Sequence, residues 1–463
     1  MTAIIRLFIS GFNVMKKKNT VFIIIYMLLL TAPSLSMPFF FNGKNSEKRE
    51  LASFPALYAE GKINADFSEQ LNDFFNDRIG FRSYLVGANT VVRKNLFGQS
   101  AVEKVIIGKK GWLFFNDTLS DYQRTDLLSE RNINNAVRTV EMMNEYLIDR
   151  DIAFVFTIIP NKNTLYPEYM KSGYKRNSAS SDMERIAEKI KHTDVAYADV
   201  YNAIKAYDRV LYQRTDSHWT YEGALVGYRC IMDSSETDYN HFDSVSFERR
   251  KDWDSDLGEM LYSEFAPKDY QDYPDLNFNY EIVSREKEPD ALSLKTENEY
   301  ASGNAFIFRD SFMNTGYIYF AENFQSASFS RSYPFNFEKI EEDTDIVVLE
   351  IVERNIENIV SKAPLMAAKK TDEELEIVEI PSDSFKIFME KKNSLYHVYG
   401  YISKDCLSDY SRIILENDNG YYEAFPVYEK GLLDEKLSDN GFSVYFSEEP
   451  KELSEIRIFL TKQ

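Results

Sequence analysis

The chain has 463 residues, a length that corresponds to two or three domains and supports a sizeable hydrophobic core without metal or disulfide staples. It carries 74 acidic and 54 basic residues, for a formal net charge of -20, so it repels phosphate backbones and we expect no nucleic-acid partner. With 44% hydrophobic and 28% charged residues, the composition is that of an ordered globular protein.

The N-terminus has the pattern of an export signal. The basic cluster Lys16–Lys18 precedes an apolar run over residues 21–30, and no charged residue follows until Lys44. A basic region before an apolar region is typical of a signal peptide, and the uncharged stretch is also long enough to span a bilayer. Residues 1–43 are therefore predicted to be a signal peptide or a signal anchor that contacts the membrane. The rest of the chain is predicted to be extracytoplasmic, either anchored or secreted.

Helices and apolar strands alternate after this segment. Such alternation predicts a mostly parallel, three-layer α/β sheet. In chain order the sequence predicts helices at residues 67–77 and 82–96, strands at 105–107 and 112–115, a helix from residue 132, a strand at 152–159, a helix after residue 181, a strand at 195–200, a helix at 219–233, and strands at 304–308 and 346–352.

The pattern changes past Pro364. Short strands recur at regular spacing, with the hairpin signals Asn419-Gly420 and Asn440-Gly441 between them. This predicts a small all-β sandwich over residues 375–463, after an α/β domain over residues 44–368. The predicted strands are residues 385–389, 396–401, 412–416, 421–428, 442–446 and 455–460.

Cysteine and histidine, the residue types that most often act as nucleophiles, bases or metal ligands, are scarce in this chain. The two cysteines, Cys230 and Cys406, lie in segments of different kinds, which argues against a disulfide, and two cysteines do not make a zinc site alone. Of four histidines, only His218 follows an aspartate, Asp216, at the start of a predicted helix. A carboxylate beside an imidazole fixes its tautomer and leaves the other ring nitrogen as a general base.

Ser311 is the candidate nucleophile. It stands where the apolar strand at residues 304–308 ends and a helix begins, the place where open α/β sheets build their sites. Each motif alone has a simpler interpretation, because an isolated Asp-Ser pair is usually a helix cap and an isolated Asp-x-His is often a surface turn. Together, Asp216, His218 and Ser311 form an acid–base–nucleophile set.

Several motifs in order resemble the DHHW proteins, which are similar to the periplasmic alginate O-acetyltransferases with a circularly permuted SGNH hydrolase-like domain. The resemblance covers about residues 47–358 and implies a three-layer, flavodoxin-like α/β domain. Permutation accounts for Asp216 and His218 preceding Ser311. The matching motifs are residues 77–82 (DRIGFR), 105–114 (VIIGKKGWLF), 160–167 (PNKNTLYP), 215–220 (TDSHWT) and 309–312 (RDSF).

The resemblance implies Ser311 as nucleophile, His218 as general base and Asp216 as the residue that orients it. Two positions depart from the family pattern. The glycine that precedes Asp-Ser in SGNH enzymes is Arg309, and the first histidine of the DHHW motif is Ser217. In an extended chain Ser217 would point away from its two neighbours.

Further residues are candidates for contact with substrate or oxyanion. The Ser311 N–H is expected in the oxyanion hole, and Arg354 follows the last predicted strand of the α/β domain. Lys162 and Tyr166 follow the strand at residues 152–159 and are expected to line the same cleft. A solvated Arg354 and purely structural roles for Lys162 and Tyr166 are the alternatives.

Aromatic residues are abundant, with 31 Tyr and 34 Phe. In the predicted sandwich, Tyr421, Tyr422 and Tyr428 suit either a carbohydrate-binding platform or cross-strand packing.

The predicted function is acetyl transfer from a donor to hydroxyls of a cell-surface or cell-wall polysaccharide, with no metal and no bound cofactor. The resemblance implies that a multipass membrane O-acyltransferase supplies the acetyl group. The alternatives are an esterase (deacetylase) with the same triad and a non-catalytic polysaccharide-binding or assembly factor. Because the first 42 residues carry four basic groups and no acidic one, the exported part has a charge of -24, which disfavours acidic polymers such as alginate.

Overall fold

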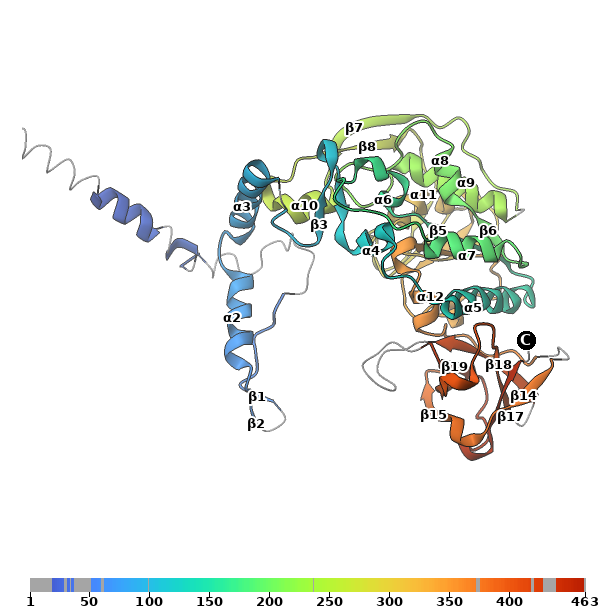
Figure 1. The fold of residues 1–463 in the computed structure, drawn as a ribbon. Coiled ribbons are helices and arrows are strands. Elements are labelled where there is room, and N and C mark those ends of the chain that lie inside the picture. The colour runs from blue at the N-terminus through green and yellow to red at the C-terminus, as the bar shows by residue number, and fades with distance from the viewer. Residues whose placement is uncertain are drawn as a thin grey trace, which may run out of the picture. The chain divides into compact units, whose positions relative to one another are not determined.

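The structure is a computed structural model, drawn in Figure 1. It describes residues 19–28, 31–33, 35–36, 51–59, 62–98, 100–235, 237–371, 375–417, 420–427 and 439–461. The chain divides into two compact units, which are Met1–Ile107 with Asp254–Lys268, and Gly108–Trp253 with Asp269–Gln463.

The predicted export signal falls partly outside the described residues. Residues 19–28 are helical, whereas Lys16–Lys18 and residues 37–50 are not described. No helix in the described part of the chain is long and apolar enough to cross a membrane.

The first unit is mainly helical. A tyrosine of α10 accepts a hydrogen bond from α3, where Lys94 Nζ reaches the Tyr262 hydroxyl. The two predicted helices of this unit are confirmed. Its elements are β1 (Tyr58–Ala59), β2 (Lys62–Ile63), α2 (Phe67–Arg78), α3 (Arg82–Phe97), β3 (Val105–Ile107) and α10 (Asp256–Tyr262).

A seven-stranded sheet forms the centre of the second unit. Its order is β6-β5-β13-β11-β12-β10-β9, and the first five strands are parallel to their neighbours while β10 and β9 run antiparallel. The predicted mostly parallel sheet is confirmed. The strands are β5 (Ala153–Ile159), β6 (Ala196–Ala198), β9 (Glu281–Ile282), β10 (Ser293–Glu297), β11 (Asn304–Phe308), β12 (Ser326–Ser330) and β13 (Ile346–Val352).

Successive side chains of the central strands pack into two different hydrophobic cores, one on each face of the sheet. In β13, Val347 and Leu349 pack with one cluster and Ile346 and Val348 with the other, because neighbouring side chains of a strand point to opposite faces. This explains the predominantly apolar sequences of β5 and β13, in which Thr157 and Glu350 are the polar exceptions. Helices cover both faces: α5 (Glu130–Ile148), α7 (Asp182–Ile190) and α12 (Asn358–Ser361) on one, and α8 (Val200–Lys205), α9 (Tyr221–Ser234) and α11 (Met313–Asn323) on the other.

Short elements lie around this sheet and include a hairpin that the sequence did not predict. The hairpin pairs Phe247 with Pro274 at its open end. These elements are β4 (Leu113–Phe115), α4 (Leu119–Gln123), α6 (Lys162–Leu165), β7 (Phe247–Trp253) and β8 (Asp269–Pro274).

The C-terminal region is an antiparallel sheet that closes around its own apolar core. Its order is β14-β20-β17-β18-β19-β16-β15, and strands from both halves share one cluster that includes Val398 and Ile458. The predicted all-β C-terminal fold is confirmed. The strands are β14 (Ile377–Glu379), β15 (Phe385–Lys392), β16 (Leu395–Ile402), β17 (Ile413–Asn417), β18 (Gly420–Val427), β19 (Gly441–Phe446) and β20 (Arg457–Thr461).

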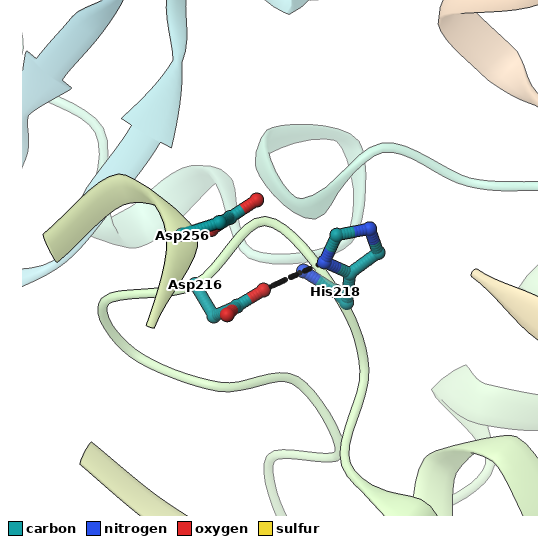
Figure 2. Close-up of side chains that lie close together, drawn as sticks. All are labelled: Asp216, His218 and Asp256. Carbon is teal, nitrogen blue, oxygen red and sulfur yellow. Dashed lines mark hydrogen bonds and ion pairs between the residues drawn. The ribbon is translucent and has the colours of Figure 1, made fainter. Parts of the chain in front are cut away.

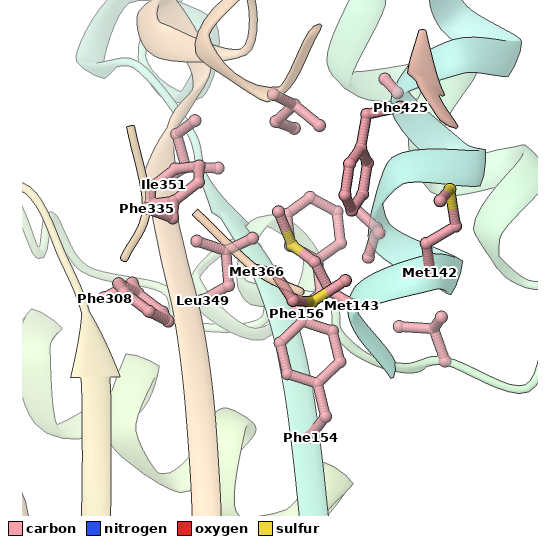
Figure 3. Close-up of a cluster of buried hydrophobic side chains, with 14 of the residues drawn as sticks. Met142, Met143, Phe154, Phe156, Phe308, Phe335, Leu349, Ile351, Met366 and Phe425 are labelled. Carbon is pink, nitrogen blue, oxygen red and sulfur yellow. The ribbon is translucent and has the colours of Figure 1, made fainter. Parts of the chain in front are cut away.

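This all-β region also contributes to the α/β core. Phe425 of β18 belongs to the same buried cluster as Met142 and Met143 of α5 and Phe156 of β5, as Figure 3 shows. The junction predicted at residues 369–374 includes 372–374, which lie outside the described residues.

The three tyrosines considered as a platform have different positions. Tyr421 is partly exposed, with 37% of its surface accessible, whereas Tyr422 packs against the apolar core of the all-β region. Tyr428 lies outside the described residues.

Candidate active site

Ser311 lies in the turn between β11 and α11, at the carboxyl end of the parallel strands. The preceding residue fixes this turn. Asp310 Oδ1 accepts the Phe312 N–H at 2.9 Å, Asp310 Oδ2 accepts the Val352 N–H at 2.8 Å, and the Asp310 N–H donates to Glu350 Oε2 at 3.0 Å. The nucleophile turn is thereby tied to the neighbouring strand β13.

The side chain of Arg309 strengthens the same turn from its other side. Its guanidinium donates to Asn314 Oδ1 at 2.6 Å and to the carbonyl oxygens of Pro289 and Ala291 at 2.7 and 2.9 Å. Arg309 is buried, and burial lowers its pKa to about 10. The residue that replaces the SGNH glycine is therefore a structural crosslink.

The structure brings Asp216, His218 and Ser311 together. His218 Nε2 lies 2.8 Å from Ser311 Oγ, and His218 Nδ1 lies 2.7 Å from Asp216 Oδ1, a contact drawn in Figure 2. The His218 side chain is 20% exposed and that of Asp216 only 4%. This is the arrangement that a Ser-His-Asp catalytic triad requires, with the imidazole between the carboxylate and the hydroxyl group.

Two further hydrogen bonds hold the Asp216 carboxylate. Oδ1 also accepts the His218 backbone N–H at 3.0 Å, and Oδ2 accepts the indole Nε1–H of Trp253 at 3.1 Å. Sequence reasoning missed Trp253, because it ends the strongly charged strand β7 and no motif connects it to Asp216.

Lys162 supports the loop that carries Asp216. Its Nζ donates to the carbonyl oxygens of Gln213, Arg214 and Asp216 at 3.0, 3.1 and 2.5 Å, and the residue is only 4% exposed. Of the two roles considered for Lys162, these contacts agree with the structural one, because three carbonyl groups converge on its ammonium group beneath the loop.

Tyr166 also has a structural partner. Its hydroxyl accepts the Leu211 backbone N–H at 3.0 Å, and burial raises its pKa to about 12. Its ring lies 5.5 Å from that of Trp112. These contacts agree with the structural role considered for Tyr166, because its hydroxyl group binds the segment that leads into the His218 loop.

Ser217 does not point away from its neighbour. Its Oγ lies 3.3 Å from His218 Nδ1. The expectation assumed an extended chain, but residues 214–218 form a series of bends, so alternation of side chains does not apply.

Arg354 lies near the triad. Its guanidinium is 5.5 Å from the ring centre of Phe312 and 5.7 Å from that of Phe115. The Phe312 ring is in turn 4.9 Å from the His218 ring. Arg354 thus shares the neighbour Phe312 with His218, whereas Lys162 and Tyr166 are engaged with backbone groups.

The Ser311 backbone N–H is available as an oxyanion donor. No acceptor in the described part of the chain takes a hydrogen bond from it. It precedes the first turn of α11, whose N-terminal N–H groups favour negative charge.

Glu350 is a second residue that the sequence did not indicate. It is 1% exposed, and burial together with the charge of Asp310 holds its pKa well above the usual value. Its Oε2 accepts the Asp310 N–H, so this buried carboxyl group supports the turn that carries Ser311. Its position as the one charged residue of the otherwise apolar strand β13 was the available signal, because a buried glutamate needs a partner.

Comparisons with known proteins agree with this fold. Residues 105–291 match the family model of the SGNH hydrolase-like domain of the acetyltransferase AlgX. A search of curated proteins found no match.

Three solved structures are similar to the chain at low identity. A DHHW family protein from Eubacterium siraeum is 16% identical over 55% of this chain and 97% of its own, with a TM-score of 0.41. Bacillus cereus PatB1 is 17% identical over 54% and 96%, with a TM-score of 0.41. The O-acetyltransferase domain of Pseudomonas putida AlgJ is 16% identical over 54% and 91%, with a TM-score of 0.34.

The family match confirms the resemblance and the fold class predicted from the sequence. The roles of individual residues remain predictions. Residues 105–291 carry an SGNH hydrolase-like domain of the AlgX acetyltransferase type, so the chain is an enzyme with such a domain.

Proposed function

We propose that the chain transfers acetyl groups to hydroxyls of an extracytoplasmic polysaccharide, with Ser311 as nucleophile, His218 as general base and Asp216 as the residue that orients His218. The observation that carries this proposal is the pair of contacts made by the imidazole, 2.8 Å to Ser311 Oγ and 2.7 Å to Asp216 Oδ1. If Asp310-Ser311 were only a helix cap and Asp216-Ser217-His218 only a surface turn, nothing would require these two segments, 93 residues apart, to be in contact.

In the first step Ser311 Oγ attacks the carbonyl carbon of the donor acetyl group. The hydroxyl proton passes to His218 Nε2, while Asp216 holds Nδ1–H and stabilises the imidazolium. The Ser311 N–H faces the negative charge that develops on the carbonyl oxygen. The leaving group takes the proton from Nε2 and departs, which leaves an acetyl ester on Ser311.

In the second step a sugar hydroxyl attacks this ester. His218 Nε2 takes the proton of the attacking hydroxyl and returns it to Ser311 Oγ as the serine leaves. The products are an O-acetylated sugar and free Ser311. Attack by water in place of the sugar gives acetate, which is the esterase reaction with the same residues.

The export signal expected from the sequence places this chemistry outside the cytoplasm, at the membrane or beyond it. Acetyl-CoA is a cytoplasmic donor, so a multipass membrane O-acyltransferase is the proposed source of the acetyl group. The C-terminal all-β region is proposed as an accessory that contacts the polysaccharide, with the exposed Tyr421 as a contact.

The test uses the exported protein and an activated acetyl ester, with and without an oligosaccharide acceptor. Mass spectrometry is expected to find acetyl on Ser311 and, with acceptor, O-acetylated oligosaccharide. Ser311→Ala removes both products, whereas the exposed serine variant Ser302→Ala retains them. Acetate with no acetylated sugar identifies an esterase. No adduct, with Ser311→Ala equal to wild type, overturns the proposal and favours a binding or assembly factor.

A further inference from the structure

An acidic cavity of about 230 Å³ lies at the carboxyl edge of the central sheet. Typical pockets for whole small molecules measure roughly 300–1,000 Å³, so this one has room for a single sugar unit of a polymer. In its described lining, Arg354 supplies the one positively charged group. The lining also holds six carboxyl groups, those of Asp117, Asp121, Asp126, Asp182, Glu353 and Glu357.

The negative charge of this lining is only partly compensated, because Asp182 forms an ion pair with Arg185 at 2.9 Å, whereas Asp121 and Glu353 are buried carboxyl groups. Burial raises the pKa of Asp121 to about 6 and that of Glu353 to about 7. Glu353 is 4% exposed, its Oε2 accepts the Asn161 N–H at 2.8 Å, and its buried Oε1 has no hydrogen-bond partner among the described residues. In the deprotonated form of Glu353 this buried oxygen lacks a donor, which is destabilising, so a cationic ligand that supplies one is favoured.

The cavity adjoins the triad through Arg354. This residue lines the cavity and also lies over the ring of Phe312, the residue that follows Ser311. Glu353 and Arg354 directly follow β13, and β13 is the neighbour of β11, which leads to Ser311. This proximity allows one polymer to place a sugar unit in the cavity and a hydroxyl of another unit at Ser311.

We propose that this cavity binds a protonated amino group of the acceptor, so that the polysaccharide acetylated at Ser311 is one that carries free amino sugars. The inference rests on the proposed function and names its substrate class. Ammonium groups donate several hydrogen bonds to carboxylates, whereas uronic acids would add a further negative charge to the site. In the described residues the cavity carboxylates do not converge closely enough to enclose a metal ion, which favours an organic cation.

Binding is measured by calorimetry in the Ser311→Ala protein, so that turnover does not interfere. The probes are a glucosamine oligomer, the N-acetylglucosamine oligomer of the same length, and calcium chloride alone. Asp121→Asn is the main variant, because the new amide oxygen can still accept the hydrogen bond that Asn161 Nδ2 donates to Asp121 at 2.9 Å. Asp126→Asn, at an exposed position of the lining, is the second variant, and the exposed Asp208→Asn is the control.

The glucosamine oligomer is expected to bind at least tenfold more tightly than its acetylated counterpart. Asp121→Asn and Asp126→Asn are each expected to reduce this preference severalfold, and Asp208→Asn to leave it unchanged. The preference is expected to weaken as ionic strength rises. Equal binding of both oligomers, or a preference unaffected by both lining variants, overturns the inference. Calcium binding that depends on Asp121, without binding of the glucosamine oligomer, also overturns it.

Acetylation of Ser311 by the activated ester, measured in the wild-type protein without acceptor, separates the two proposals. If acetyl-Ser311 forms but the glucosamine oligomer is not preferred, the amino-sugar inference fails and the proposed chemistry stands. If no acetyl-Ser311 forms, the proposed function fails, whatever the oligomers do.

Discussion

The indole Nε1–H of Trp253 donates to Asp216 Oδ2, 3.1 Å away, while Oδ1 of the same carboxylate faces His218 Nδ1. The carboxylate is thus held at both oxygens and cannot rotate away from the imidazole without losing a hydrogen bond. Trp253 is a positioning residue, because it acts on the proposed base only through Asp216.

Trp253→Phe is expected to lower the rate of Ser311 acetylation about tenfold, since the ring is retained but the donor to Asp216 is lost. The concentration of activated ester that gives half-maximal rate should change little. Loss of the donor also makes Asp216 more basic, so the acid limb of the pH–rate profile should move. A merely structural role would instead lower the thermal midpoint and leave the profile in place.

Lys162→Met is expected to lower both stability and acetylation, because three backbone carbonyl groups beneath the catalytic loop lose their shared donor. The Arg214 carbonyl keeps the Leu113 N–H as a donor at 3.0 Å, so the carbonyl groups of Gln213 and Asp216 are the ones that depend on Lys162. Each unpaired buried carbonyl costs about 1–3 kcal/mol, so a loss of about 2–6 kcal/mol is expected in urea unfolding. Lys175→Met, at an exposed position, is the control. A stable Lys162→Met protein with normal acetylation would show that the loop does not depend on this ammonium group.

Glu353→Gln is expected to change how stability depends on pH. The folded-state pKa of Glu353 is about 7 against a usual 4.5, chiefly because of burial, with the charge of Asp121 adding to it. Between these two values the folded chain holds a proton that the unfolded chain has released, so this group makes stability fall as pH rises from 4.5 to above 7.

At pH 8 the Glu353→Gln variant should therefore be more stable than wild type by on the order of 3 kcal/mol, and at pH 4 the two should be nearly equal. Urea unfolding at a series of pH values measures this difference. Curves that run parallel across the whole pH range would contradict a buried, proton-binding Glu353.

Glu423 connects the all-β region to the α/β domain. It accepts two hydrogen bonds from Arg138 of α5, at 2.8 and 2.7 Å, and two from Arg412, at 2.9 and 2.5 Å. Burial alone would raise its pKa, but hydrogen bonds and charges from the two guanidinium groups outweigh burial and lower it. The stability that Glu423 provides is therefore present above the usual glutamate pKa and is lost as pH falls through the lowered value.

Glu423→Gln is expected to cost about 3–5 kcal/mol at pH 7, because it leaves two guanidinium groups without their shared buried partner. The difference from wild type should narrow as the solution is acidified below about pH 4. Glu455→Gln, at an exposed position of the same region, controls for loss of a surface charge. A difference independent of pH would show that the ion pairs contribute little.

The triad was predictable because its residues lie in compact motifs. Asp216 and His218 are two residues apart, and Ser311 stands at a strand end marked by the apolar run at residues 304–308. The sequence also predicted the central strands, since β5 and β13 are buried on both faces and therefore almost entirely apolar. The all-β C-terminal region followed from the change to short, regularly spaced strands.

The positions of several residues around the triad could not be predicted from local sequence motifs. Lys162 follows a central strand, as substrate-contacting residues do, yet its ammonium group is enclosed by carbonyl groups of a loop about 50 residues away. The bends that turn Ser217 toward His218 depend on that same loop. Trp253 donates to Asp216 from the β7–β8 hairpin, whose strands lack the alternation of apolar and polar residues that would have predicted them.

The sequence by itself determined the kind of chemistry, because a nucleophile, a base and its carboxylate are chemical identities that local motifs carry. Only the tertiary structure decided how they are held and what surrounds them. Lys162 and Trp253 contact Asp216, and Glu350 contacts Asp310, although each contact joins segments far apart in the sequence. The acidic cavity is likewise formed by three separate stretches between residues 117 and 357. Such contacts are set by packing of the whole sheet and its helices, and no short segment encodes them.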